Sequence, residues 1–243
     1  DAVKIVDALP RGTETQISSL SFKFISSNVP LARAIAEYVN ATPSVTCIDV
    51  AEDYVEVMFA SAFAAALTND AKARLRDVRE GPRSPFLPKL GFTGLRKVWL
   101  PFYQSSITYT SDWGCDTGWG NAVEELEIEF DVAHPVPHGT NFASLFPNLK
   151  RLSLSARSTG CDLANVVPAL PPTLERLSVE QVIDVTKFLR RSLADGACPW
   201  LRCVTLGAVD DVIGLMPAAA TIEDLTVTES RYPAAVRVTR NVS

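Results

Sequence analysis

The side chains that could hold a metal ion are the two histidines of this 243-residue chain, His134 and His138. Two histidines at positions i and i+4 can bind zinc when a helix presents both on one face. Here Pro135 and Pro137 stand between and beside them, and proline disfavours the interior of a helix. The segment is therefore interpreted as a proline-rich loop, and we expect neither a metal ion nor any other cofactor.

A second group with potential chemistry consists of four carboxylates, Glu124, Glu125, Glu127 and Glu129. Paired carboxylates can act as general acid and base when their surroundings separate their pKa values. Three of these four alternate with apolar residues, as on the solvated face of a strand. The chain also contains no glycine-rich phosphate loop and no G-x-S-x-G elbow. We therefore expect no enzymatic activity and no small-molecule substrate.

The cysteines are odd in number and contain no C-x-x-C pair; they are Cys47, Cys115, Cys161, Cys198 and Cys203. Neither a closed set of disulfides nor a zinc site fits this spacing. Reduced, buried thiols are the expected state, which favours an intracellular and cytoplasmic location.

Charge and hydropathy restrict the class of partner. The net charge is −5, and no run of basic residues is longer than two, so a nucleic acid is not expected. The alanine-rich stretch 55–67 is too short to span a bilayer, so no membrane association is expected. The remaining expectation is a protein partner.

An apolar spacing at i, i+3 and i+5 organises the chain, and we call it the strand motif. It is clearest in Leu149-Lys150-Arg151-Leu152-Ser153-Leu154. The middle apolar residues of five consecutive copies lie at positions 98, 126, 152, 177 and 204, in steps of 28, 26, 25 and 27 residues. Further copies centre on Leu20, Ile48 and Leu225. Self-similarity at such a period is typical of a solenoid.

The strand motif resembles that of the leucine-rich repeat family, in which a strand L-x-x-L-x-L is followed by a returning helix or irregular arm. The resemblance implies an α/β solenoid of about eight or nine units, with a parallel sheet on one face and short helices and irregular arms on the other. We expect a single domain over residues 1–243, with residues 81–94 as the place for an internal break. The asparagine that many family members carry after the strand is replaced by Arg157, Val182, Val209 and Ser230, which predicts irregular units.

Between the strand motifs, apolar spacing predicts the remaining elements. A strand is expected at 19–24, a helix at 30–39, and a helical run at 56–78 that Asn69-Asp70 interrupts and caps. Shorter helices are expected at 141–146, 162–167, 185–193 and 210–215, and residues 1–16 are expected to cover the first end. The step from Ile48 to Val98 is 50 residues, twice the period, so the strand motif expected near residue 73 is either missing or degenerate.

Successive side chains of a strand point to opposite faces, so the residues between the apolar positions should form outward columns on the sheet. The first column is predicted to contain Lys97, Glu125, Arg151, Arg176, Cys203 and Asp224, and the second Trp99, Glu127, Ser153, Ser178, Thr205 and Thr226. A third would contain Pro101, Glu129, Ser155, Glu180, Gly207 and Thr228. The charges either neutralise one another or form a recognition surface beside an exposed Trp99.

A long aromatic segment, residues 101–121, follows Trp99 and lengthens one unit. It carries Tyr109, Trp113 and Trp119 among serine, threonine, aspartate and glycine residues, and cannot be a regular helix. Two interpretations stay open: a loop that covers the solenoid, or a loop that binds a partner.

These features predict a non-catalytic protein-binding module. Its expected contacts are Lys97, Trp99, Glu125, Glu127, Arg151 and Arg176 on the sheet, with Tyr109, Trp113 and Trp119 on the loop. Segments such as Leu149-Lys150-Arg151-Leu152 and Leu174-Glu175-Arg176-Leu177 also resemble the repeats of F-box substrate receptors. The resemblance implies an alternative as the substrate-receptor part of a ubiquitin-ligase adaptor, and a structural subunit of a large assembly is a third reading.

Overall fold

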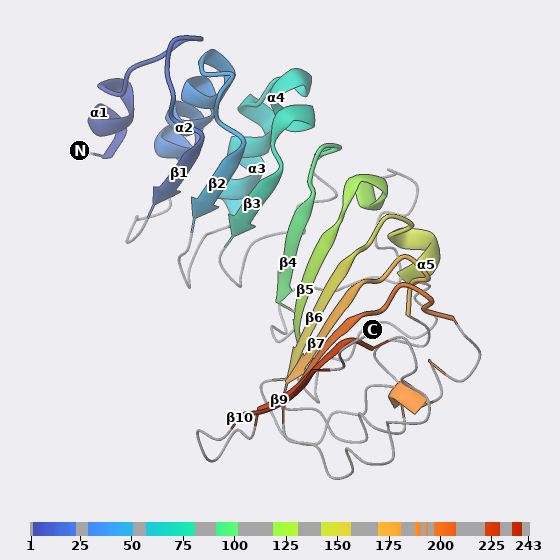
Figure 1. Ribbon diagram of the computed structural model, residues 1–243. Helices are drawn as coiled ribbons and strands as arrows, with labels where there is room; N and C mark the ends of the chain where they lie inside the picture. Colours follow the sequence, from blue (N-terminus) through green and yellow to red (C-terminus); the bar gives the residue numbers. More distant parts are fainter. Residues whose placement is uncertain are drawn as a thin grey trace. The chain divides into compact units, whose positions relative to one another are not determined.

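In the computed structural model, the chain folds into two compact units (Figure 1). The N-terminal unit comprises residues 1–99 and 104–123, and the C-terminal unit comprises residues 100–103 and 124–243. The described residues are 2–22, 29–50, 57–80, 91–101, 119–130, 142–156, 170–180, 188–190, 193, 197–207, 222–228 and 235–239. A single solenoid over residues 1–243 stays a prediction.

Strands and helices alternate in the N-terminal unit. In chain order its elements are α1 (Ala2–Asp7), β1 (Ser19–Phe22), α2 (Val29–Ala41), β2 (Cys47–Val50), α3 (Val57–Ala66), α4 (Asn69–Arg74), β3 (Asp77–Glu80), β4 (Lys97–Pro101) and the 3-10 helix η3 (Trp119–Ala122). The last two residues of β4 belong to the C-terminal unit. The strands β1, β2 and β3 are parallel and paired in sequence order, and Lys97 of β4 pairs with Asp77 of β3.

The helices of this unit pack on one face of its strands, as Figure 1 shows for α2 and α3. Helix α2 contacts α1 on one side and α3 on the other, and its residues Leu31, Ile35, Tyr38 and Val39 are fully buried. Their spacing follows the helical period, because residues three and four apart lie on the same helix face. The helix predicted at 30–39 is confirmed.

Of the two alternatives for the copy between Ile48 and Val98, missing or degenerate, the structure shows the degenerate one. Strand β3 supplies that motif, with Leu75 and Val78 buried at its first two apolar positions. Its third apolar position holds Glu80, so the spacing was not recognised in the sequence. The predicted helical run therefore ends at Arg74 and does not continue to Val78.

The break in that helical run is confirmed, but its capping residue differs from the prediction. Thr68 precedes α4, and its Oγ1 accepts a hydrogen bond from the Ala71 N–H at 3.2 Å. A threonine hydroxyl in this position satisfies one of the free N–H groups of the first turn. Asn69 and Asp70, predicted as the cap, lie inside the helix.

The C-terminal unit contains the most regular strand motifs. Its described elements are β5 (Glu125–Phe130), α5 (Phe142–Leu145), β6 (Arg151–Ala156), β7 (Arg176–Glu180), β8 (Cys203–Leu206), β9 (Asp224–Thr228) and β10 (Ala235–Thr239). Strands β5 to β9 are parallel and lie side by side in sequence order, whereas β10 runs antiparallel to β9. The α/β class with a parallel sheet is therefore confirmed.

The core of this unit is built from equivalent positions of successive strand motifs. Leu126, Leu152, Leu177, Val204 and Leu225 pair in register across five strands, and each is at most 4% exposed. The first apolar residues, Leu149, Leu174 and Leu201, are fully buried as well. Burying a leucine side chain contributes about 1.5–3 kcal/mol, so these columns dominate the stability of the sheet. Val98, the fifth residue predicted for the column, is buried in the N-terminal unit.

The short helix predicted at 141–146 is confirmed as α5, where the rings of Phe142 and Phe146 lie 5.7 Å apart. The helices predicted at 162–167 and 210–215 and the loop at 81–88 lie outside the described residues, as does most of the helix predicted at 185–193. Among the helices that are described, none has the length and apolar character needed to cross a bilayer.

Candidate functional site

The outward columns predicted for the sheet exist in the C-terminal unit. Glu125, Arg151, Arg176, Cys203 and Asp224 are direct neighbours across β5 to β9, and so are Glu127, Ser153, Ser178, Thr205 and Thr226. The third column is formed by Glu129, Ser155 and Glu180 over three strands. Since neighbouring strands lie about 4.8 Å apart, these columns bring polar side chains from separate strand motifs into one surface.

The first outward column contains an ion pair between Glu125 and Arg151. The Arg151 Nη1 atom lies 2.6 Å from the Glu125 Oε1 atom, and the two side chains are 55% and 33% exposed. Exposed pairs of this kind stabilise a protein by roughly 0–1 kcal/mol. The pair therefore adds little to the fold and leaves its groups accessible to solvent.

Arg176 interrupts the alternation of opposite charges in the first outward column. It is exposed and pairs in register with Arg151 on one side and Cys203 on the other. Among the residues that the structure describes, none forms an ion pair or hydrogen bond with its guanidinium. Two arginines side by side repel each other, so the first column keeps an unsatisfied positive charge.

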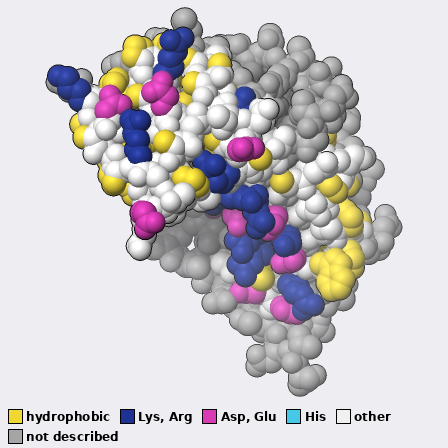
Figure 2. Space-filling model, turned by 90° about the horizontal axis from the view of Figure 1, so that it is seen from above, with side chains coloured by type: hydrophobic (Ala, Val, Ile, Leu, Met, Phe, Trp, Pro, Cys, Tyr) yellow, Lys and Arg dark blue, Asp and Glu magenta, His cyan; other side chains and the backbone are white. Residues whose placement is uncertain are grey.

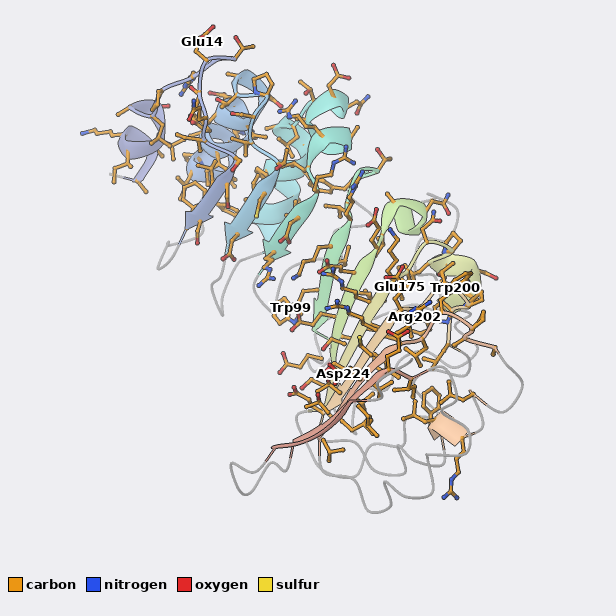
Figure 3. The ribbon with its side chains drawn as sticks, in the orientation of Figure 1. Glu14, Trp99, Glu175, Trp200, Arg202 and Asp224 are labelled. Atoms are coloured by element: carbon orange, nitrogen blue, oxygen red, sulfur yellow. The ribbon has the colours of Figure 1, made fainter. Side chains whose placement is uncertain are left out.

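Lys97 and Trp99 lie on β4, where Lys97 pairs in register with Asp77. Trp99 lies on the face opposite to buried Val98, but it is half-buried and not fully exposed as predicted (Figure 3). Strand alternation gives the direction of a side chain but not what packs beside it, so the partial cover could not be read from the sequence.

The aromatic loop residues stay untested. Tyr109 and Trp113 lie outside the described residues, and Trp119 is described only as the first residue of η3. The structure therefore favours neither the covering nor the binding interpretation of the loop.

A charged column at the starts of the strands was missed in the sequence analysis; it consists of Glu124, Lys150, Glu175, Arg202 and Glu223. Backbone hydrogen bonds of 2.8–3.0 Å join each of these residues to the next. Its charges alternate in sign, and Figure 2, which looks onto the strand ends from above, shows acidic and basic side chains next to one another. In the sequence, this column could have been recognised because a charged residue directly follows the first apolar position of each of these five motifs.

Two ion pairs lie in this column, which we call the edge column. The Lys150 Nζ atom is 3.4 Å from the Glu124 Oε2 atom, and Arg202 pairs with Glu223. Glu175, between Lys150 and Arg202, is exposed and has no ion-pair partner among the described residues. The middle of the edge column therefore carries an unsatisfied negative charge.

The described cysteines Cys47, Cys198 and Cys203 are free thiols. Burial raises the pKa of the Cys198 thiol to about 11, and its Sγ donates a hydrogen bond to the Pro171 carbonyl at 3.6 Å. Cys198 is therefore a protonated core residue at neutral pH and a poor nucleophile. No cluster of histidine, cysteine or carboxylate side chains that could hold a metal ion occurs within the described ranges.

No protein-family model matches the chain, and no curated protein matches its sequence. What the described surface offers chemically is hydrogen bonding and charge pairing. Hydroxyls of the second column, the unpaired Arg176 and the unpaired Glu175 are groups that bind other polar surfaces.

Proposed function

We propose that the chain is a leucine-rich-repeat-like solenoid that acts as a non-catalytic protein-binding module and recognises its partner through the exposed sheet face. The supporting observation is the in-register outward surface of β5 to β9, which combines charged groups with a row of hydroxyls. Such a surface has the polar, partly charged character of a transient protein interface.

Two side chains give this surface unsatisfied charge. Arg176 in the first column and Glu127 in the second have no ion-pair partner among the described residues. A partner surface that supplies opposite charges would gain two charge-assisted hydrogen bonds without breaking the Glu125–Arg151 pair. Complementary charge of this kind contributes specificity and association rate.

The test is photo-crosslinking from defined positions. A photoreactive amino acid at Ser178, in the second column, should give a discrete crosslinked product in native lysate. The same amino acid at Glu37, exposed on α2, is the control and should not give this product. Arg176→Glu should abolish the Ser178 product without changing the melting temperature, because Arg176 is exposed and unpaired.

Equal crosslinking from Ser178 and Glu37, or a product that survives Arg176→Glu, would contradict binding through the sheet. The identity of the crosslinked protein then separates the alternatives. A ubiquitin-ligase subunit or its substrate would support the adaptor function, and a stable neighbour in a large complex would support a structural subunit.

A further inference from the structure

The turn before β8 presents an exposed aromatic side chain from a fixed backbone. Trp200 is 58% exposed, although Cys198 and Leu201 near it are buried. The Leu201 N–H donates to the Cys198 carbonyl at 3.2 Å, and Cys198 Sγ donates to the Pro171 carbonyl. These two contacts fix the backbone on both sides of Trp200.

In three other strand motifs, the residue at the position of Trp200 forms a hydrogen bond to the preceding motif. This position directly precedes the first apolar residue of a motif. Its side chain donates a hydrogen bond to the backbone carbonyl of the first apolar residue in the preceding motif. The three bonds run from Ser44 to Ile17 at 2.8 Å, from Arg74 to Val45 at 3.4 Å and from Thr173 to Leu149 at 2.8 Å. Trp200 makes no such bond among the described residues and leaves its ring in water. A tryptophan here therefore loses a stabilising contact and exposes apolar area, which is unfavourable for the isolated fold.

The unpaired carboxylate of the edge column lies beside this turn. The Arg202 N–H donates to the Glu175 carbonyl at 3.0 Å, so Glu175 neighbours the residue two positions after Trp200. Figure 3 labels Glu175, Trp200 and Arg202 in this region. Arg202 pairs with Glu223 and Lys150 pairs with Glu124, so neither forms an ion pair with Glu175 in the described part of the chain.

We propose that Trp200 and Glu175 form a docking point for a basic segment of a partner protein. A lysine or arginine side chain would lie against the indole face and pair with the Glu175 carboxylate. Cations are attracted to the face of tryptophan, and a charge-assisted hydrogen bond to a carboxylate adds to that attraction. The net charge of −5 also favours approach of a basic segment over an acidic one.

This docking point goes beyond the sheet-face proposal, because it uses the turn and edge column and not the outward columns. Its occupant is tested with defined peptides on the full chain. A fluorescent peptide of alternating lysine and serine should bind with measurable anisotropy change, and its glutamate–serine counterpart should not. In a nuclear magnetic resonance titration, the indole N–H signal of Trp200, assigned by its loss in Trp200→Phe, should shift with the lysine peptide.

Trp200→Ala and Glu175→Gln should each weaken lysine-peptide binding at least about tenfold, as expected for an aromatic anchor and a charged partner. Glu180→Gln is the matched control, because Glu180 is an exposed glutamate at the end of β7, the strand that directly follows Glu175, and has no ion-pair partner in the described part of the chain. It should leave the affinity unchanged. Glu175→Gln keeps the side-chain shape, so a folding defect is not expected to obscure the result.

Four results would overturn the proposal: no binding up to millimolar peptide, equal loss in Glu180→Gln, equal binding of the glutamate peptide, or no shift of the Trp200 indole. Sedimentation provides a further test. Self-association that Trp200→Ala removes would show that a second copy of the chain covers this residue in place of a basic partner. Failure here would leave the sheet face untouched, since that surface is tested separately at Ser178 and Arg176.

Discussion

The two units join successive strand motifs by different kinds of contact. In the N-terminal unit, part-buried side chains reach backbone carbonyls one motif away: Tyr38 Oη donates to Pro10, Asn40 Nδ2 to Ala66 and Ser44 Oγ to Ile17, over 26–28 residues of sequence. In the C-terminal unit, contacts over 21–26 residues of sequence include the exposed ion pairs Lys150–Glu124, Arg151–Glu125 and Arg202–Glu223. Thr173 Oγ1 of the C-terminal unit also donates to the Leu149 carbonyl at 2.8 Å, so that unit combines neutral bonds between motifs with exposed ion pairs between them.

This difference bears on function. A part-buried hydrogen bond to a backbone carbonyl is shielded from water, and its loss leaves a polar group without a partner. An exposed ion pair contributes little and exchanges readily with solvent. The N-terminal unit therefore uses its polar side chains for its own stability. The exposed ion pairs of the C-terminal unit contribute little to its stability and stay in contact with solvent.

The largest expected effect tests whether the C-terminal unit depends on its apolar columns more than on its charges. Leu152→Asp places a charge at a position that is 2% exposed, between Leu126 and Leu177. We expect a loss of roughly 5 kcal/mol, from the missing leucine and the buried unpaired carboxylate together. Hydrogen exchange should show lost protection across residues 151–156. Unchanged melting and unchanged exchange would contradict the observed core.

The register of this sheet could be predicted from the sequence because the strand motifs of the C-terminal unit keep nearly constant spacing. The apolar residues of each motif point inward, so they fix which side chains of each strand point outward and which of these are neighbours. The neighbours Glu125, Arg151 and Arg176 could therefore be predicted directly. Strand β3 was missed because Glu80 replaces an apolar residue at the edge of a short strand. In β3, the buried side chains of Leu75 and Val78 are enough to form the strand, and an apolar residue at the third position of the motif is not required.

The candidate site could be predicted only in part. Alternation placed Trp99 opposite Val98, but its half-buried state depends on packing that spacing does not determine. Trp200 was missed because its significance comes from comparison with Ser44 and Thr173, whose hydrogen bonds to preceding motifs are visible only in three dimensions. Apolar periodicity predicts buried positions well, because burial requires an apolar residue at a regular spacing. It predicts exposed aromatic residues such as Trp200 poorly, because no such spacing is required of them.

The next effect concerns Arg74, whose side chain forms two part-buried hydrogen bonds in the N-terminal unit. Arg74 Nη2 donates to the Val39 carbonyl at 2.8 Å and Nε donates to Val45 at 3.4 Å. Arg74→Met keeps most of the side-chain stem but removes both bonds, and we expect a loss of about 3 kcal/mol in urea unfolding. Arg33→Met, at an exposed position of α2, is the control and should change stability by less than about 0.5 kcal/mol. Similar losses of stability for the two variants would contradict a stabilising role of the two Arg74 hydrogen bonds.

A smaller effect isolates a single neutral hydrogen bond. Tyr38 is fully buried in α2, and its hydroxyl donates to the Pro10 carbonyl at 2.9 Å. Tyr38→Phe retains the ring and removes only this bond, so we expect a loss of about 1 kcal/mol. The loss should be nearly the same at low and high salt, because neither group carries a formal charge. A strong salt dependence in this variant would contradict the contrast between the two units.

The smallest effect concerns the ion pair Arg151–Glu125, and it is measured with a double-mutant cycle of Arg151→Ala and Glu125→Ala. Their atoms approach to 2.6 Å, but both side chains are partly in water. The coupling energy should therefore be about 0.5 kcal/mol at low ionic strength. At about 1 M salt the Debye length falls to about 3 Å, and the coupling should decrease toward zero. A coupling above about 2 kcal/mol that persists at high salt would mean that this pair stabilises the C-terminal unit as strongly as the buried bonds stabilise the N-terminal unit. In that case the Glu125–Arg151 ion pair would be needed for stability, and a partner that binds these two charges would have to break the pair and destabilise the fold.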